Sequence, residues 1–300
     1  MKSSGSPVVL ASVAVLSWST VATAFKVALQ TMNTFEMLFV ACATALIIFT
    51  VWMLVTGSWH ELRLIRGQLW IRFAVLGLIA PVVYYLMLFE AYNLLPAQIA
   101  QPINYVWPII LAILIALVER NPIPNAKYLG MVMSLSGVGF ISLGGNAISG
   151  EISVMGIVFA IGSAGLWAIY WMINDTLKDK VSETPALFLT FLFGMAYLFI
   201  GSLFFPIRQI QSESLLAGMY IGAFEMGVPF ICFGLAIRET KNPALINQLC
   251  YLAPFLSLFI ISMVLEETIL PTTYIGLALI IGGIIYNQYL ADKVSQVLKI

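Results

Sequence analysis

Residues 95–128, LPAQIAQPINYVWPIILAILIALVERNPIPNAKY, decide the fold of this chain. The central part of the stretch is too apolar and too long for a helix of a soluble protein, and Pro102 and Pro108 interrupt it. A helix that crosses a bilayer needs about 20 mostly apolar residues. We therefore interpret the stretch as a broken membrane-spanning helix that ends in a short polar loop.

A second copy of this stretch lies 146 residues further along the chain. The two copies match without a gap at Tyr105 and Tyr251, Pro108 and Pro254, Tyr128 and Tyr274, Gly130 and Gly276, and Gly137 and Gly283. An offset of 149 residues relates earlier parts of the chain, and it pairs Trp18 with Trp167, Leu38 with Leu187 and Phe39 with Phe188. Such internal similarity indicates a duplicated architecture. We expect two domains, 1–148 and 149–300, each a copy of one unit.

The composition places the chain among membrane proteins. Of its 300 residues, 61% are hydrophobic and 9% are charged, whereas soluble proteins average about 25% charged residues. The formal net charge is zero, which argues against a nucleic-acid partner. Cys42, Cys232 and Cys250 lie in apolar runs and are interpreted as packed thiols. With His60 the only histidine, we expect no metal site of the His/Cys type and no cofactor.

The sequence predicts an all-α, polytopic membrane protein with ten transmembrane helices. The spans are expected at about 8–29, 35–56, 69–91, 95–118, 127–145, 154–173, 186–205, 215–237, 243–265 and 273–290. The first run has features of a signal peptide, since Lys2 precedes it and residues 22–24 read Ala-Thr-Ala. The matching span in the second copy favours a helix that is retained.

The distribution of Lys and Arg predicts the orientation, because these residues concentrate in cytoplasmic loops. If the N-terminus is cytoplasmic, all of the 14 Lys and Arg residues except Lys26 and Arg208 fall on the cytoplasmic side. We expect both termini in the cytoplasm and the chain in the inner (plasma) membrane. Five spans in each copy, an odd number, make the second copy inverted. Inverted repeats are typical of secondary transporters, whose binding site lies near the midplane between the repeats.

Prolines interrupt matching spans of the two copies. Pro81 and Pro229 lie in the third and eighth spans, and Pro108 and Pro254 lie in the fourth and ninth. A proline frees a backbone carbonyl, which a membrane tolerates only where protein or a water-filled cavity satisfies it. We predict these four prolines to be hinges of a transport site, and ordinary packing kinks remain the alternative.

The candidate substrate-binding residues are polar and aromatic residues near these breaks, together with Trp18 in the first span and Trp167 and Tyr170 at the matching place of the sixth. Amides and phenols at midplane depth need partners in the bundle or in a substrate. Tryptophans near span ends are usually interface anchors, and buried packing is the competing explanation for those nearer the middle. The candidates are Trp18, Tyr84, Tyr85, Asn104, Tyr105, Trp107, Trp167, Tyr170, Glu225, Asn247 and Tyr251.

Two acidic residues within predicted spans have different interpretations. Glu225 lies near the centre of the span 215–237, where an ionisable group is costly and indicates function. Glu225 is expected to bind a proton or the ammonium group of a substrate. Glu90 and Lys26 lie near the outer ends of their spans, and we expect them to form a structural pair.

The duplicated spans and the motif Tyr-x-x-Pro followed by an apolar run ending in Glu resemble the EamA-type exporters of the drug/metabolite transporter superfamily. The motif occurs as Tyr105 to Pro108 before Glu119, and as Tyr251 to Pro254 before Glu266. The sequence Asn-Tyr-x-Trp-Pro at 104–108 is similar to that of the YddG-type branch of aromatic amino-acid exporters. The resemblance implies a central cavity lined by spans 1, 3, 4, 6, 8 and 9, with Trp18, Tyr84, Trp107 and Trp167 as candidates for its wall.

We therefore predict a transporter, not an enzyme, that exports small amphipathic metabolites, above all amino acids, by alternating access. Its partners are a small-molecule substrate and the lipid bilayer, and coupling to protons and the oligomeric state are left open. Other cargo in the same fold is the main alternative, although a nucleotide sugar would call for basic residues at midplane depth. An intramembrane enzyme would need a catalytic dyad or metal cluster there. A scaffold protein without cargo would leave the broken, duplicated helices unexplained.

Overall fold

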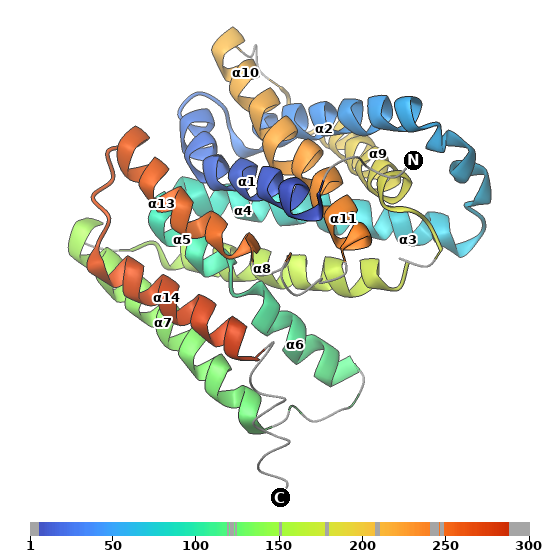
Figure 1. Ribbon diagram of the computed structural model, residues 1–300. Helices are drawn as coiled ribbons and strands as arrows, with labels where there is room; N and C mark the ends of the chain where they lie inside the picture. The colour runs from blue at the N-terminus through green and yellow to red at the C-terminus, as the bar shows by residue number, and fades with distance from the viewer. Residues whose placement is uncertain are drawn as a thin grey trace, which may run out of the picture.

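The computed structural model describes residues 6–118, 120, 123, 125–149, 152–177, 180–207, 211–240, 246 and 249–287. This part of the chain is helical and contains no strand (Figure 1). Its elements are α1 (Pro7–Leu29), α2 (Thr34–Thr56), η1 (Ser58–Leu64), α3 (Gln68–Gly77), η2 (Leu78–Val83), α4 (Tyr84–Leu94), α5 (Ala97–Asn104), α6 (Trp107–Val118), α7 (Asn125–Ser149), α8 (Val154–Asp175), α9 (Glu183–Gly201), α10 (Ser212–Ile221), η3 (Gly222–Gly227), α11 (Val228–Glu239), α13 (Leu252–Val264) and α14 (Pro271–Ile285).

Seven helical stretches of the described chain are long and apolar enough to cross a membrane: Pro7–Leu29, Thr34–Thr56, Gln68–Leu94, Ala97–Val118, Val154–Asp175, Glu183–Gly201 and Ser212–Glu239. The helices α13 and α14 are apolar but shorter. Together with α7, they occupy the places of the three remaining predicted spans. The all-α prediction is confirmed in the described residues, while the count of ten spans stays a prediction.

The predicted breaks in the third and eighth spans are π-helical segments. In η2, Ala80 leaves the helical conformation (φ −141°, ψ 120°) directly before Pro81. In the eighth span, η3 lies between α10 and α11 and precedes Pro229, which falls in the first turn of α11. Proline is tolerated in a first turn because the N–H that it lacks would be unbonded there. The backbone therefore changes course at matching places of the two copies.

The fourth span is divided at Tyr105 and Val106, between α5 and α6. Pro108 is the second residue of α6. In the ninth span, Tyr251 directly precedes α13, and Pro254 is the third residue of that helix. The prolines predicted as hinges in these spans thus lie at helix starts, where a fixed φ is compatible with the new helix.

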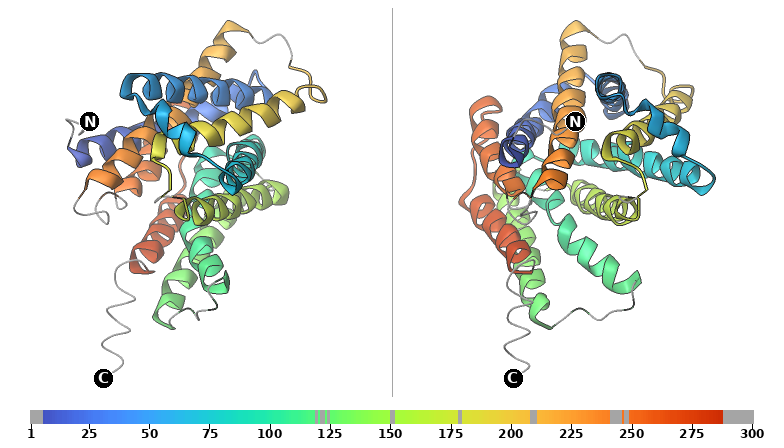
Figure 2. Two further views of the ribbon diagram at one scale, coloured as in Figure 1. Left: turned by 90° about the vertical axis from the view of Figure 1, so that its right-hand side faces the viewer. Right: turned by 45° about the vertical axis from the view of Figure 1, so that its right-hand side comes forward.

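Contacts between the copies are reciprocal. The helices α7 and α14 lie side by side (Figures 1 and 2). A Cβ on Gly130 would collide with the backbone of Gly283, and a Cβ on Gly137 would collide with that of Gly276. The offset of 146 relates Gly130 to Gly276 and Gly137 to Gly283. The contact between Gly130 and Gly283 is therefore the counterpart of the contact between Gly137 and Gly276. The absence of side chains lets the two backbones approach closely.

Some residues also contact their own counterparts. Ser134 Oγ donates to the carbonyl of Ile280, 146 residues away, at 3.1 Å. Cys42 Sγ donates to the carbonyl of Phe191, 149 residues away, at 3.8 Å. Whole helices pack in the same reciprocal way. The helix α1 packs on α11 and α13 of the second copy, and α8 of the second copy packs on α4 and α6 of the first.

Candidate functional site

The ring of Trp167 in α8 is the centre of an aromatic cluster. It stacks on Tyr84 with ring centroids 4.7 Å apart and an interplanar angle of 25°. Within α8 it stacks on Tyr170 at 5.1 Å and 12°. The ring of Phe230, from α11, lies 5.8 Å away. Helices from both halves of the chain therefore contribute to one aromatic surface.

Trp18 in α1 joins this cluster through the same phenylalanine. Its ring centroid lies 6.3 Å from that of Phe230 and 5.5 Å from that of Phe233, and both contacts are edge-on. The indole Nε1 donates to the backbone carbonyl of Glu225 at 3.1 Å. This carbonyl belongs to η3, where the helical bonding pattern is altered. Trp18 therefore has a specific polar contact in addition to its packing.

The carboxyl group of Glu225 lies inside the bundle. The residue is 9% exposed, and the hydroxyl of Tyr85 donates to its Oε1 at 3.2 Å. Among the described residues, no Lys or Arg forms an ion pair with Glu225. A buried carboxylate without a cation is costly, so the group is poised to take up a proton or to meet a cationic ligand.

Asn104 lies at the end of α5, directly before the break. Its Nδ2 donates to Ser163 Oγ at 2.9 Å, and Ser163 Oγ donates to the Ala160 carbonyl at 2.8 Å. The Asn104 side chain also interacts with the Tyr84 hydroxyl. This amide thus links the broken fourth span to α8 and to the aromatic cluster.

Trp107 reaches the cluster through Trp171, which the sequence analysis did not select. Their rings are nearly parallel, at 18° with centroids 6.4 Å apart, and Trp171 also contacts Trp167 at 6.0 Å. Ser163 was missed as well. Both residues lie four positions from Trp167, so they share its helix face, and that spacing was the available signal.

The remaining candidates lie beside the ninth span. Tyr105 is half-buried and lies within electrostatic range of Tyr251 and Glu225. Tyr251 itself is buried. Asn247 lies outside the described residues. Eight of the eleven candidate residues are therefore connected by ring contacts and hydrogen bonds around the aromatic cluster. Tyr105 lies directly beside them, and Tyr251 is adjacent to Tyr105.

The predicted pair of Glu90 and Lys26 is wrong. Lys26 Nζ donates to the carbonyls of Tyr92 at 2.9 Å and Leu95 at 3.2 Å. Glu90 instead accepts a hydrogen bond from Asn93 at 3.4 Å. The end of α4 leaves backbone carbonyls unbonded, and these are better placed than a carboxylate one turn earlier.

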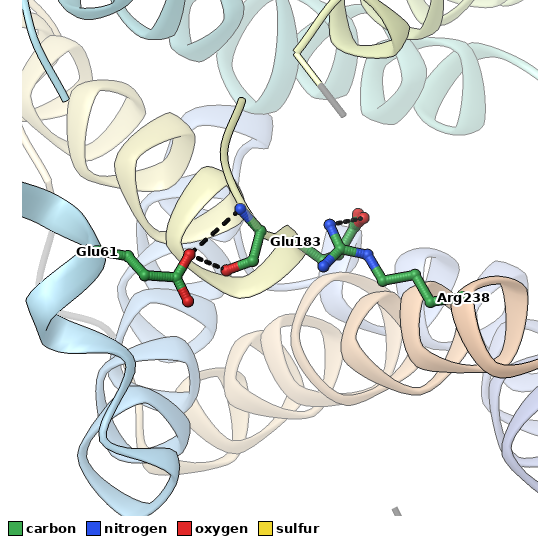
Figure 3. Close-up of polar contacts among 4 residues, drawn as sticks. Glu61, Glu183 and Arg238 are labelled. Atoms are coloured by element: carbon green, nitrogen blue, oxygen red, sulfur yellow. Dashed lines mark hydrogen bonds and ion pairs between the residues drawn. The ribbon is translucent and has the colours of Figure 1, made fainter. Parts of the chain in front are cut away.

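A polar cluster of Glu61, Ser182, Glu183 and Arg238 joins η1, α9 and α11 (Figure 3). Glu61 accepts hydrogen bonds from the backbone N–H and the hydroxyl of Ser182, which directly precedes α9. Glu183 forms an ion pair with Arg238 of α11 at 3.5 Å. Both groups of the pair are partly exposed, so its contribution to stability is small. These contacts tie η1, α9 and α11 together, and Glu183 also interacts electrostatically with Tyr170 of the aromatic cluster.

A cavity of about 540 Å³ opens near the turn between α1 and α2. Polar residues dominate its lining, including Gln30, Asn33, Glu36, Glu90 and Asn93. None of the predicted substrate-binding residues lines it. We therefore place the candidate site at the aromatic cluster and Glu225, not at this cavity.

Apolar spans around a buried site of aromatic, amide and carboxyl groups define a multi-pass membrane protein. The chain belongs to the EamA-like transporter family, whose model matches residues 5–143 and 154–287. The family is a branch of the drug/metabolite transporter superfamily, so the chain is a membrane transporter, as the resemblance implied.

Relatives agree with this assignment. The chain is 24% identical over 228 residues to an uncharacterized transporter, YvbV, of Bacillus subtilis (strain 168), covering 75% of this chain and 73% of the relative. An uncharacterized transporter of Clostridium kluyveri is 28% identical over 187 residues, covering 60% and 59%. A solved crystal structure, 22% identical, has a similar fold, with a TM-score of 0.69 and coverage of 96% of this chain and 98% of the other.

Proposed function

We propose that this transporter exports small amphipathic metabolites, above all aromatic amino acids, by alternating access. The observation that carries the proposal is the joint site of Trp18, Tyr84, Trp167 and Glu225, with contributions from both halves of the chain. Aromatic faces offer apolar contact to a ring, and they attract an ammonium group by about 0.5–2 kcal/mol each. The Glu225 carboxylate complements that ammonium group, and the Asn104 amide is suited to the substrate carboxylate.

The proposed architecture is ten spans in two inverted repeats, 1–148 and 149–300. It is supported by the reciprocal glycine contacts of α7 and α14 and by the counterpart contact of Ser134 with Ile280. Two inverted halves can exchange access by rocking about a site between them. The π-helical segments η2 and η3 give both halves a flexible point beside that site.

The proposed orientation places both termini in the cytoplasm of an inner (plasma) membrane, from the distribution of Lys and Arg. The turn between α4 and α5 and the loop between α13 and α14 then face outward. The cluster of Glu61, Ser182, Glu183 and Arg238 faces the cytoplasm. Export from the cytoplasm requires the site to open first toward that cluster.

The test is transport by the purified protein in proteoliposomes, with a panel of radiolabelled amino acids, cationic drugs and nucleotide sugars. Each is measured with and without a pH gradient. We expect saturable transport of aromatic amino acids. Unlabelled amides of these amino acids should compete with the labelled substrate less well than the unlabelled amino acids do. Transport of another class alone would assign the fold a different cargo, and transport indifferent to the pH gradient would make the protein a uniporter.

A further inference from the structure

The short helix α5 connects one end of the bundle to the site. All of its eight residues are buried. Its last residue is Asn104, and Tyr105 and Trp107 follow within the next three residues. A shift or rotation of α5 therefore moves three candidate substrate-binding residues together.

The N-terminus of α5 is held by a carboxylate from a distant loop. The residue before the helix is Pro96, which has no side-chain oxygen to cap it. Glu267 takes this role, accepting from the N–H of Ala97 at 3.1 Å with Oε1 and from the N–H of Gln98 at 3.3 Å with Oε2. The first N–H groups of a helix are unbonded and carry partial positive charge. Both oxygens of Glu267 thus neutralise the start of α5.

The Gln98 side chain ties the helix to the same loop. Gln98 is 1% exposed, and its Nε2 donates to the Thr268 carbonyl at 3.0 Å. Its Oε1 accepts from the Leu270 N–H at 3.3 Å and from Thr273 Oγ1 at 3.0 Å. The amide spans the loop from α13 into the first turn of α14. In Figure 1 this loop follows the left-hand edge of the molecule.

Lys26 completes the arrangement from the other side of the turn. It donates to the carbonyls of Tyr92 and Leu95 at the end of α4, and it interacts electrostatically with Glu267. A cation thus caps the end of α4 while an anion caps the start of α5, as the helix dipoles favour. We call Lys26, Gln98, Glu267 and Thr273 the α5 latch.

The second copy does not repeat these side chains. At an offset of 146, Gln98 corresponds to Ala244, Glu267 to Asn121 and Thr273 to Lys127. In the sequence of the second copy, the positions that correspond to Glu267 and Gln98 therefore carry neither a carboxylate nor a glutamine. A rocking carrier with such a device on one face favours the state in which that face is closed.

We propose that Glu267 is a positioning residue that holds α5, and with it the site, closed toward the outer face. This inference rests on the proposed transport function and orientation. Opening toward the outside requires the loop between α13 and α14 to leave α5, which breaks the bonds of Glu267 and Gln98. The latch thereby makes the cytoplasm-facing state the resting state of an exporter, ready to load cargo.

The test measures the separation of the two sides of the latch. Nitroxide labels are attached to cysteines replacing Leu94 and Met263, which are exposed at the ends of α4 and α13, after the native cysteines have been replaced by alanine. The distances between the two labels are measured by pulsed electron paramagnetic resonance, with the protein in lipid nanodiscs. In E267Q we expect about a tenfold rise in the ratio of long to short distances, because hydrogen bonds to a charged group are lost.

E266Q is the matched control, since it removes the same charge from the neighbouring, exposed residue. We expect E266Q to leave the distances unchanged and E267D to restore part of the short population. Q98M breaks the second half of the latch independently, so a folding defect of one variant does not decide the result. Unchanged distances in both E267Q and Q98M, or an equal change in E266Q, would overturn the proposal.

Transport supplies a second readout that a purely structural role would not produce. A larger outward-open population lowers the apparent KM from the outer face in proportion, so E267Q should lower it about tenfold and raise the KM from the cytoplasmic face. An equal change of KM on both faces would contradict the latch. The distances need no substrate, so shifted distances without any amino-acid transport would refute the proposed cargo and leave the latch standing.

Discussion

Glu225 accepts hydrogen bonds from two residues that lie in different helices of the first half of the chain. Tyr85 donates to its side chain, and Trp18 donates to its backbone carbonyl. A neutral carboxyl and a carboxylate both accept the tyrosine bond, but only the carboxylate attracts a cation. Under the proposed function, substrate and proton compete for the same group, and such competition is what couples an export step to proton entry.

At the scale of single residues, we expect E225Q to abolish the pH dependence of amino-acid transport. Glutamine resembles the protonated carboxyl and cannot release a proton, so its behaviour is fixed across the pH range. The rate of substrate exchange in proteoliposomes between pH 5.5 and 8.5 measures this. E213Q, at the exposed start of α10, is the control and should retain the wild-type profile. A profile of E225Q that parallels the wild type would remove Glu225 from proton coupling.

Tyr85 provides a second test at this scale. Y85F deletes the hydroxyl that donates to Glu225 while keeping the ring, and the loss of such a bond to a charged group costs about 1.5–3 kcal/mol. We expect Y85F to shift the pH midpoint of transport without abolishing its pH dependence. The matched control is Y197F, which removes a bond to the Ala74 carbonyl elsewhere in the bundle. An identical pH midpoint in Y85F and the wild type would contradict the role of the hydroxyl.

Single elements show what the sequence could predict and what it could not. The offset of 146 identified Gly130 and Gly137 as counterparts of Gly276 and Gly283. It could not show that these glycines contact one another, because a sequence repeat identifies equivalent residues but not the helices that pack together. The Tyr-x-x-Pro motif likewise located the break after α5. The capping of α5 by Glu267 could not be predicted, since it joins residues 170 apart through loop geometry.

The seam of α7 and α14 yields a stability prediction at the scale of elements. In G137A the new methyl group would meet the Gly276 carbonyl and lie 2.8 Å from Ile280 Cγ1. Overpacking of this kind costs about 1–3 kcal/mol, so the melting temperature in detergent should fall. The matched control is G139A, because a Cβ at Gly139 has no neighbour within 4 Å. Equal melting temperatures of both variants would mean that the seam is not tightly packed.

At the scale of the whole molecule, fold and function could be predicted further than the site. The membrane spans were predicted from apolar runs, and the family assignment agrees with a multi-pass membrane transporter. The duplication was predicted from matched residues and stays a prediction. The site was predicted from residue types near helix breaks, from aromatic residues at matching places of the two copies, and from the depth of Glu225 in its span. Ser163 and Trp171 share the helix face of Trp167, which was an available signal, but their contacts with Asn104 and Trp107 arise from helix packing.

The proposed inverted architecture makes one prediction about the entire chain: the loop before α9 and the loop before α10 lie on opposite faces of the membrane, and both termini lie on the face of the loop before α9. In a variant without native cysteines, one cysteine replaces Asp175 at the end of α8 and another replaces Glu213 at the start of α10, so that the two lie on either side of α9. In right-side-out vesicles, an impermeant maleimide should label D175C only after permeabilisation and E213C before it. Five spans in each half require this result together with cytoplasmic termini, which cysteines at Ser3 and Lys299 report in the same assay. Labelling of the two terminal cysteines from opposite faces would leave an odd number of spans, and an odd number is incompatible with two inverted five-span halves around one site.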